Sequence, residues 1–163
     1  MDGIMRKLPI GIQTFEKLRE GGYLYVDKTA FVWKIASTET PYFLSRPRRF
    51  GKSLLLSTFE AYFEGKKELF EGLTIAELEK EWKKYPVLHL DLNAEKYDSP
   101  QALVEILSRH LTQWEVKYGK GEDEETLSGR FAGVIRRASE QAGCGVVVLV
   151  DEYDKPLLQA LGN

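Results

Sequence analysis

Cysteine is almost absent from this sequence, and long apolar runs are missing. The single cysteine, Cys144, cannot form a disulfide within the chain, which is typical of a reducing compartment. The longest apolar run, residues 146–150, is far too short to cross a bilayer, and residues 1–10 lack the apolar core of a signal peptide. We therefore expect a cytoplasmic protein with no membrane partner.

The sequence also has no large excess of charge of either sign. Its formal net charge is −2, from 23 lysines and arginines and 25 aspartates and glutamates. Because the chain has no overall positive charge to attract nucleic acid, any contact with nucleic acid needs a local basic patch. No repeat and no linker rich in proline, glycine or serine divides the 163 residues, which are enough for one domain with a buried core.

Short apolar segments alternate with segments of helical period. We expect strands at residues 42–44, 87–92 and 146–150. The last of these is apolar at every position, which is typical of a strand buried on both faces of a parallel sheet. Helices are expected over residues 14–20 and 27–36, from Lys52 to Gly65, from Thr74 to before Tyr85, from Ser99 to Trp114, and over residues 127–138. This alternation predicts an α/β architecture.

Local signals predict where several helices begin and end. Asp27 is suited to cap the second helix, and Thr74 with Glu77 matches a capping box. Ser99 followed by Pro100 indicates a helix start, whereas Gly143 indicates a helix end. The acidic residues 122–125 are expected in a solvated loop and helix entry.

The segment from Arg46 to Ser53 lies between an expected strand and an expected helix, which is the context of a Walker A phosphate-binding loop. Backbone N–H groups there point at an anion, and Gly51 permits its close approach. We expect Lys52 to contact the β- and γ-phosphates and Ser53 to bind Mg²⁺. The alternative is a surface helix start that carries a lysine. The predicted nucleotide-binding residues are Arg46, Pro47, Arg48, Arg49, Phe50, Gly51, Lys52, Ser53 and Leu54.

The motif is imperfect, because Arg46 stands where its first glycine usually lies. The arginines Arg46, Arg48 and Arg49 add positive charge for phosphate, steady the loop through carboxylates, or contact nucleic acid. A phosphate-binding loop already explains local basicity, which favours the first two interpretations.

Residues 146–152 match a Walker B motif, which is the second half of the same constellation. The strand delivers Asp151 to its carboxyl end, where open α/β sheets bind ligands. Asp151 is expected to hold Mg²⁺, and Glu152 to polarise the attacking water as a general base. By itself the pattern also fits a buried strand that ends in a polar turn. Both motifs in this order favour catalysis by Lys52 and Glu152.

These motifs closely resemble those of the AAA-ATPase-like family. The similarity covers Leu8-Pro9-Ile10-Gly11-Ile12, Tyr25-Val26-Asp27-Lys28-Thr29, FLSRPRRFGKS at residues 43–53, YPVLHLD at residues 85–91 and LVDEYDKP at residues 149–156. The resemblance makes the missing first glycine a family trait. It also implies a P-loop domain that continues beyond residue 163 and is commonly followed by a restriction-endonuclease-like domain.

The resemblance suggests a second nucleotide contact before the phosphate loop. In related ATPases this segment lies near adenine and ribose, so Tyr25 is a candidate to stack on the base, with Asp27 beside it. The alternative is structural, with Asp27 as a helix cap beside a packed aromatic residue.

The remaining residues that could bind a metal ion or act in catalysis are not expected to form a site. His89 and His110 fit packing positions better than metal ligation, and Cys144 has no partner for zinc. The triplets at residues 81–83 and 115–117 mimic a nuclease motif, but both fall in helical patterns, whereas that chemistry needs a strand.

We therefore expect residues 1–163 to form the N-terminal part of a single P-loop domain, a three-layer sandwich with a mainly parallel sheet. This part ends after the Walker B strand, so a strand between the Walker A and Walker B strands is expected to be missing. The expected function is binding of ATP and Mg²⁺, with hydrolysis only in the full-length protein. A non-hydrolysing switch and a nucleic-acid-associated module are the alternatives. The open sheet also suggests self-association.

Overall fold

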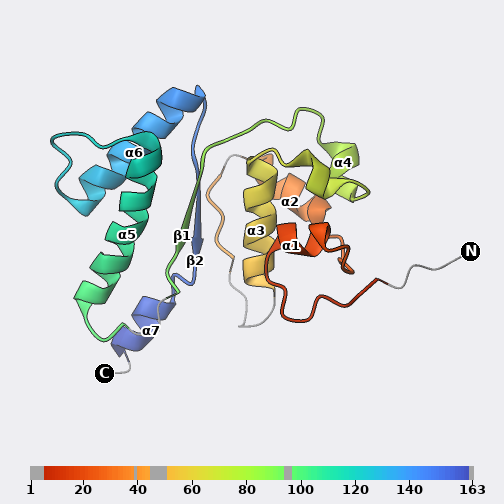
Figure 1. Cartoon of the computed structure of the whole chain (residues 1–163), viewed down its shortest axis with the longest axis horizontal. Coiled ribbons are helices and arrows are strands. Elements are labelled where there is room, and N and C mark those ends of the chain that lie inside the picture. The colour runs from red at the N-terminus through yellow and green to blue at the C-terminus, as the bar shows by residue number, and fades with distance from the viewer. Residues whose placement is uncertain (1–5, 39, 45–50, 94–96, 162–163) are drawn as a thin grey trace, which may run out of the picture. The chain divides into compact units, whose positions relative to one another are not determined.

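The structure is a computed structural model that describes residues 6–38, 40–44, 51–93 and 97–161. The chain divides into two compact units, Met1–Lys84 and Tyr85–Asn163, here called the N-terminal and C-terminal units (Figure 1). Each unit is described by itself.

The described part of the N-terminal unit is helical. Its α-helices begin within two residues of the predicted positions, because each apolar face is local. The helix predicted from Thr74 to before Tyr85 is too long, since it ends at Leu78 and the triplet at residues 81–83 lies outside any helix. The elements are α1 (Phe15–Glu20), α2 (Thr29–Ala36), α3 (Lys52–Phe63), the 3₁₀ helix η1 (Lys67–Phe70) and α4 (Thr74–Leu78).

The core of this unit is built from aromatic and aliphatic side chains of α1, α2, α3, α4 and η1. Phe15 and Phe70 are fully buried, and their ring centroids lie 4.8 Å apart. The Phe15 N–H donates to Ser57 Oγ at 2.9 Å, which ties the start of α1 to the middle of α3. Packing and this hydrogen bond together fix the direction of α3, the helix that begins at Lys52.

The predicted strand at residues 42–44 is wrong. These residues have no regular secondary structure, and the side chains of Tyr42 and Phe43 are 57% and 72% exposed. An apolar run of this length becomes a strand only where a neighbouring strand completes its hydrogen bonds. The sequence pattern contains no information about that neighbour.

The C-terminal unit combines helices with a parallel pair of strands and is therefore α/β. Its elements are β1 (Val87–Asp91), α5 (Pro100–Tyr118), α6 (Leu127–Ala142), β2 (Val147–Asp151) and α7 (Lys155–Leu161). β1 and β2 are hydrogen-bonded in register from Val87 opposite Val147 to Asp91 opposite Asp151. Figure 1 shows α5 and α6 beside one face of this pair, with α7 following the carboxyl end of β2.

Two apolar clusters join these elements. Leu88 of β1 is fully buried against Val134 and Ala138 of α6, together with Tyr118. The other cluster lies near the carboxyl end of the strands and consists of Leu92, Tyr97 and Ile106, with Tyr153 packed against it. The second cluster therefore holds the segment that follows β2.

Burial of β2 on both faces, which the sequence predicted, is not observed. Val148 and Val150 are 39% and 40% exposed. Among the described residues the sheet has two strands, so β2 has one hydrogen-bonded neighbour there. Apolar composition predicted the strand correctly, but burial depends on how many elements surround it.

Two of the predicted helix boundary signals are confirmed, and the predicted capping box is not. Gly143 ends α6 with a left-handed φ of 66°, and Pro100 is the first residue of α5, as predicted. The capping box is wrong: Thr74 is the first residue of α4, and its Oγ1 donates to Asp27 Oδ2 at 2.8 Å. A long-range carboxylate replaces the local glutamate as its partner.

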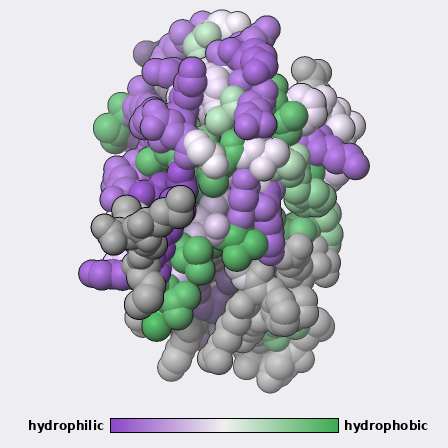
Figure 2. All heavy atoms as spheres, turned by 90° about the vertical axis from the view of Figure 1, so that its right-hand side faces the viewer, coloured by the Kyte–Doolittle hydropathy of each residue, from purple (hydrophilic) through white to green (hydrophobic). Residues whose placement is uncertain are grey.

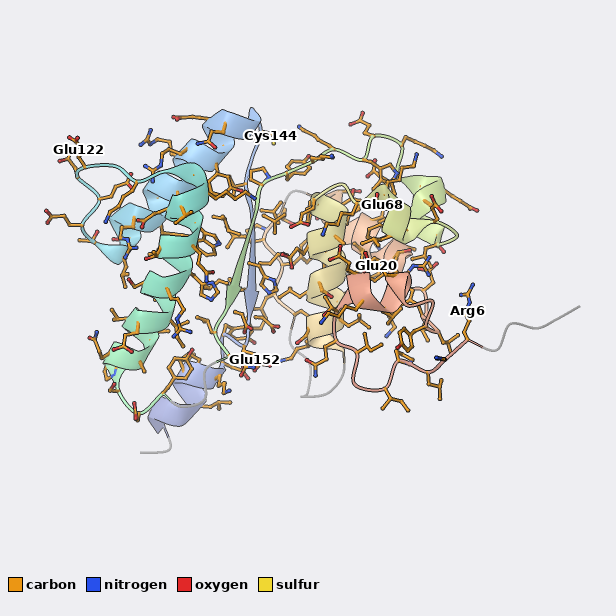
Figure 3. All side chains as sticks on the ribbon, in the orientation of Figure 1. Arg6, Glu20, Glu68, Glu122, Cys144 and Glu152 are labelled. Atoms are coloured by element: carbon orange, nitrogen blue, oxygen red, sulfur yellow. The ribbon has the colours of Figure 1, made fainter. Side chains whose placement is uncertain are left out.

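The acidic connection between α5 and α6 is only partly solvated. Glu122 lies on its outer side (Figure 3), but Glu124 is 13% exposed and forms a two-pronged ion pair with Arg137 at 2.6 and 2.9 Å. Gly133 makes this approach possible, because a Cβ there would collide with the Glu124 carboxylate. Position 133 therefore needs a glycine for the Glu124 carboxylate to pack against the helix.

The face drawn in Figure 2 is dominated by hydrophilic residues, with apolar residues in small separate groups. Within the described ranges, every helix is too short or too polar to serve as a membrane span.

Candidate nucleotide and metal sites

The first candidate site lies at the start of α3. Gly51 precedes the helix with φ 74° and ψ 22°, a left-handed conformation that favours glycine. Its carbonyl accepts the Leu55 N–H at 2.9 Å, so the helix begins directly after it. The N–H groups of Lys52, Ser53 and Leu54 belong to the first turn of the helix and have no acceptor within it, and the first turn of a helix is where anions bind.

The rest of the predicted loop, Arg46, Pro47, Arg48, Arg49 and Phe50, lies outside the described residues. Lys52, Ser53 and Leu54 are half-buried. Among the described residues of the N-terminal unit, Lys52 takes part in no ion pair, whereas Lys66 is paired with both Glu16 and Glu64. Lys52 thus differs from a lysine held by neighbouring carboxylates.

An apolar pocket of ≈ 600 Å³ lies beside Gly51 within the same unit. This volume falls within the range of about 300–1,000 Å³ found for small-molecule pockets. Several of its apolar side chains are open to solvent, including Val26 at 71% and Phe31 at 48% exposure. Its lining residues are Leu8, Pro9, Leu18, Leu24, Tyr25, Val26, Lys28, Ala30, Phe31, Gly51, Leu54, Leu55 and Thr58.

Tyr25 lies in the pocket wall and is also packed into the unit. Its ring meets Phe15 edge-on at 5.3 Å, and its hydroxyl is hydrogen-bonded to Thr58. Burial raises the pKa of the Tyr25 hydroxyl, and the hydrogen bond with Thr58 opposes that change. Tyr25 is therefore neutral, and its hydroxyl is held by α3.

Asp27 joins two helix starts. Its Oδ1 accepts from the N–H and the hydroxyl of Thr29 at 2.9 and 2.6 Å, at the beginning of α2. Its Oδ2 accepts from the N–H and the hydroxyl of Thr74 at 2.7 and 2.8 Å. Partial burial raises the pKa of Asp27, but these hydrogen bonds outweigh it and lower the pKa to about 2. The carboxylate therefore holds the pocket-lining segment to α4.

The second candidate site is the carboxyl end of the strand pair in the C-terminal unit. Asp151 is the last residue of β2, and Asp91 is its register partner at the end of β1. The sequence analysis assigned no role to Asp91. One signal was present, because VLHLD and VVLVD are both apolar strands that end in aspartate.

Glu152 follows directly in a left-handed conformation, with φ 56°. Its N–H donates to Asp151 Oδ1 at 2.9 Å, and its carbonyl accepts the Lys155 N–H at 3.1 Å. The chain therefore turns sharply between β2 and α7, and Figure 3 shows Glu152 just beyond the end of the β2 arrow. In the same turn, Asp154 Oδ1 is buried and has no hydrogen-bond partner among the residues that the structure describes.

The histidines do not form a metal centre in the described ranges. No group of three or more His, Cys, Asp or Glu side chains is placed there to hold a metal ion. His110 Nε2 lies 3.0 Å from the Asp91 carbonyl oxygen, so that ring has a backbone partner.

The predicted residues thus fall into two groups that lie in different units. Gly51, Lys52 and Ser53 come together at the start of α3, and Tyr25 lines the pocket beside Gly51. Asp151 and Glu152 follow one another at the end of β2.

The comparisons with known proteins identify the class of protein. The chain belongs to the predicted AAA-ATPase family, whose model matches residues 9–163. This confirms the resemblance seen in the sequence.

A curated relative is 45% identical over 157 residues, which cover 96% of this chain. It is an uncharacterised protein in the 5′ region of vnfD in Azotobacter chroococcum mcd 1. The chain spans 30% of that relative's length. No solved structure matches the chain.

Proposed function

We propose that this chain binds ATP with Mg²⁺ and that, in the whole protein, it contributes to ATP hydrolysis. The observation that carries the proposal is the left-handed Gly51 before Lys52 and Ser53, at the start of the 12-residue helix α3. This geometry directs the N–H groups of the first helical turn and the positive end of a helix dipole toward an anion. Family membership supports nucleotide as the ligand.

The adjacent pocket gives the rest of the nucleotide a place to bind. A purine base is flat and mostly apolar, which suits a pocket lined by Leu24, Val26 and Phe31. Phosphates at Gly51 would lie at one edge of this pocket, because Gly51 is itself a lining residue. Tyr25 contributes one wall as a base contact, whereas Asp27 acts through its bonds to Thr29 and Thr74.

Mg²⁺ fits the donor set that the family motifs supply. It prefers oxygen ligands and is usually held by one or two protein oxygens, phosphates and water, so a cluster of three acidic residues is not required. In this proposal Ser53 would supply a hydroxyl and Asp151 a carboxylate. Asp154 Oδ1, which is buried without a partner in the described ranges, is a further acceptor in the turn after Asp151. When bound, Mg²⁺ would neutralise part of the phosphate charge.

The remaining roles belong to side chains of this chain. Lys52 neutralises the β- and γ-phosphates, and Glu152 accepts a proton from the attacking water. The proposed fold of the whole domain is the P-loop three-layer sandwich, in which the β1–β2 pair is part of a larger parallel sheet. The proposed compartment is the cytoplasm.

A non-hydrolysing nucleotide switch is the second candidate function. Glu152 argues against it, because a pure binding module has no need of a carboxylate after Asp151. A nucleic-acid module that uses Arg46, Arg48 and Arg49 is the third candidate. Binding to DNA at low and high salt tests that module, because phosphate contacts weaken steeply as salt rises.

The test separates binding from chemistry in the whole protein. Glu152→Gln is expected to keep MgATP affinity but to lower kcat by at least about a hundredfold, the usual contribution of a general base. Asp151→Asn is expected to raise the Mg²⁺ concentration needed for binding. A Glu152→Gln protein that hydrolyses ATP at the wild-type rate removes Glu152 as the base. Wild-type binding without any hydrolysis favours the switch.

A further inference from the structure

The conformation of Glu152 needs a structural explanation. Only two described non-glycine residues have a positive φ, Trp82 and Glu152. The left-handed region is unfavourable for a side chain with a Cβ atom, and such strain persists only where the surroundings enforce it. Neighbouring contacts must therefore hold Glu152 in this conformation.

The contacts before Glu152 come from the strand pair. The Leu92 N–H donates to the Asp151 carbonyl at 3.0 Å, which continues the β1–β2 ladder up to the residue before Glu152. Asp151 Oδ1 then accepts the Glu152 N–H at 2.9 Å. The chain thus enters the turn from a fixed position.

The contacts after Glu152 come from the segment that leaves β1. Tyr153 packs against the cluster of Leu92, Tyr97 and Ile106, and Tyr97 donates its hydroxyl proton to the Leu92 carbonyl at 2.6 Å. The Lys155 ammonium donates to Asn93 Oδ1 at 2.5 Å. All these partners lie within the C-terminal unit.

We infer that Asn93 and Lys155 are positioning residues for Glu152, and that their hydrogen bond closes the turn that keeps Glu152 left-handed at the end of β2. This inference rests on the proposed function of Glu152 as the general base. Neither residue touches the nucleotide in this account. They act because a shift of about 1 Å in a reacting group can lower a rate as much as a hundredfold.

The first test measures the backbone conformation and needs no activity. At most positions glycine is less stable than alanine, because it loses more entropy on folding. At a left-handed position the order reverses. In the full chain, Glu152→Gly is expected to unfold about 2–4 °C above Glu152→Ala. The opposite order would overturn the strained conformation on which the inference depends.

The second test measures, through the kinetics of the whole protein, the effect of the hydrogen bond between Asn93 and Lys155, here called the clamp. Lys155→Met and Asn93→Ala each remove the hydrogen bond and are expected to lower kcat about tenfold, with KM for MgATP unchanged. The double variant is expected to be no worse than either single variant, because both remove the same contact. Asn93→Asp keeps an oxygen acceptor and is expected to recover most of the lost rate.

Lys66→Met is the matched control, since Lys66 is a partly exposed lysine that pairs with Glu16 and Glu64 within the N-terminal unit. It is expected to retain the wild-type kcat. If Lys155→Met also retains the wild-type kcat while Glu152→Gln is inactive, the clamp is wrong and the proposed function stands. If Glu152→Gln is fully active, the proposed base is wrong, whatever the clamp variants do.

Discussion

Asp91 and Asp151 are register partners at the carboxyl ends of the parallel strands β1 and β2. Like charges that lie opposite each other on neighbouring strands destabilise a sheet. A bound cation reverses this effect, because it is attracted to both carboxylates. The pair therefore links the stability of the C-terminal unit to the proposed Mg²⁺ site.

Asp91→Asn is expected to have opposite effects with and without nucleotide. In metal-free protein it removes a charge opposite Asp151 and is expected to raise Tm by about 1–2 °C. With MgATP it is expected to reduce the ligand-induced rise in Tm, because the attraction for Mg²⁺ is weaker. The hydrogen bond from the Asn93 N–H to Asp91 Oδ1 survives, since asparagine keeps an oxygen acceptor. Thermal unfolding under both conditions checks this, and a fall in Tm without metal contradicts it.

Gly133→Ala is expected to destabilise the chain although alanine is the better helix former. Helix propensity alone predicts a gain of about 1 kcal/mol. The new Cβ collides with the Glu124 carboxylate, which must leave Arg137. We expect a net loss of about 1–2 kcal/mol, typical of overpacking. The double variant Gly133→Ala with Glu124→Ala is expected to lose less than the sum of the two single variants, measured by urea unfolding.

The same ion pair predicts how stability responds to acid. Hydrogen bonds from Arg137 and from the Gly121 N–H lower the pKa of Glu124 from its usual 4.5 to about 2. Because the pKa is depressed in the folded state, its stabilisation is complete above about pH 5 and is lost as the pH falls toward 2. Glu124→Gln is expected to remove this part of the pH dependence in unfolding measured from pH 7 to pH 2.

Glu140→Gln is the matched control for that series. Glu140 pairs with Arg136 on the same helix, but these side chains are 62% and 60% exposed. Exposed pairs of this kind contribute little to stability. A pH profile that changes equally in both variants would contradict the assignment to Glu124.

Asp27→Asn is expected to lower stability more than nucleotide affinity. The asparagine NH₂ group replaces one of the two oxygens that accept from Thr29 and Thr74. The backbone N–H of one of these threonines then faces another hydrogen-bond donor. We expect a loss of about 1 kcal/mol, as for other lost helix caps. MgATP affinity, measured by calorimetry where the variant is folded, is expected to change less than threefold. A large loss of affinity at unchanged stability would place Asp27 on the nucleotide instead.

Local patterns in the sequence predicted α1, α2, α3, α5 and α6, the strands β1 and β2, and the start of α4, but not the early end of α4 or the 3₁₀ helix η1. Gly51 and Gly143 were also predicted correctly as helix boundaries, because glycine in a left-handed conformation is a local property. Features that depend on distant partners were not predicted. Thr74 was assigned to a local capping box, but its partner Asp27 lies 47 residues earlier in the chain.

The candidate sites divide in the same way. Lys52, Ser53, Asp151 and Glu152 could be named from motifs, because the roles proposed for them follow from order and spacing. The placement of Asp91 beside Asp151 requires the strand register, and the contact of Lys155 with Asn93 spans 62 residues. Neither is visible in a single sequence without its pairing.

The start of α3 is proposed to bind the phosphates of ATP. Calorimetric titration of MgATP into wild type and into Lys52→Ala tests this contact. Loss of a charge-assisted contact predicts an affinity weaker by about tenfold to a hundredfold, with an unchanged circular dichroism spectrum. Equal affinity in the two proteins would contradict the phosphate site at Gly51, Lys52 and Ser53.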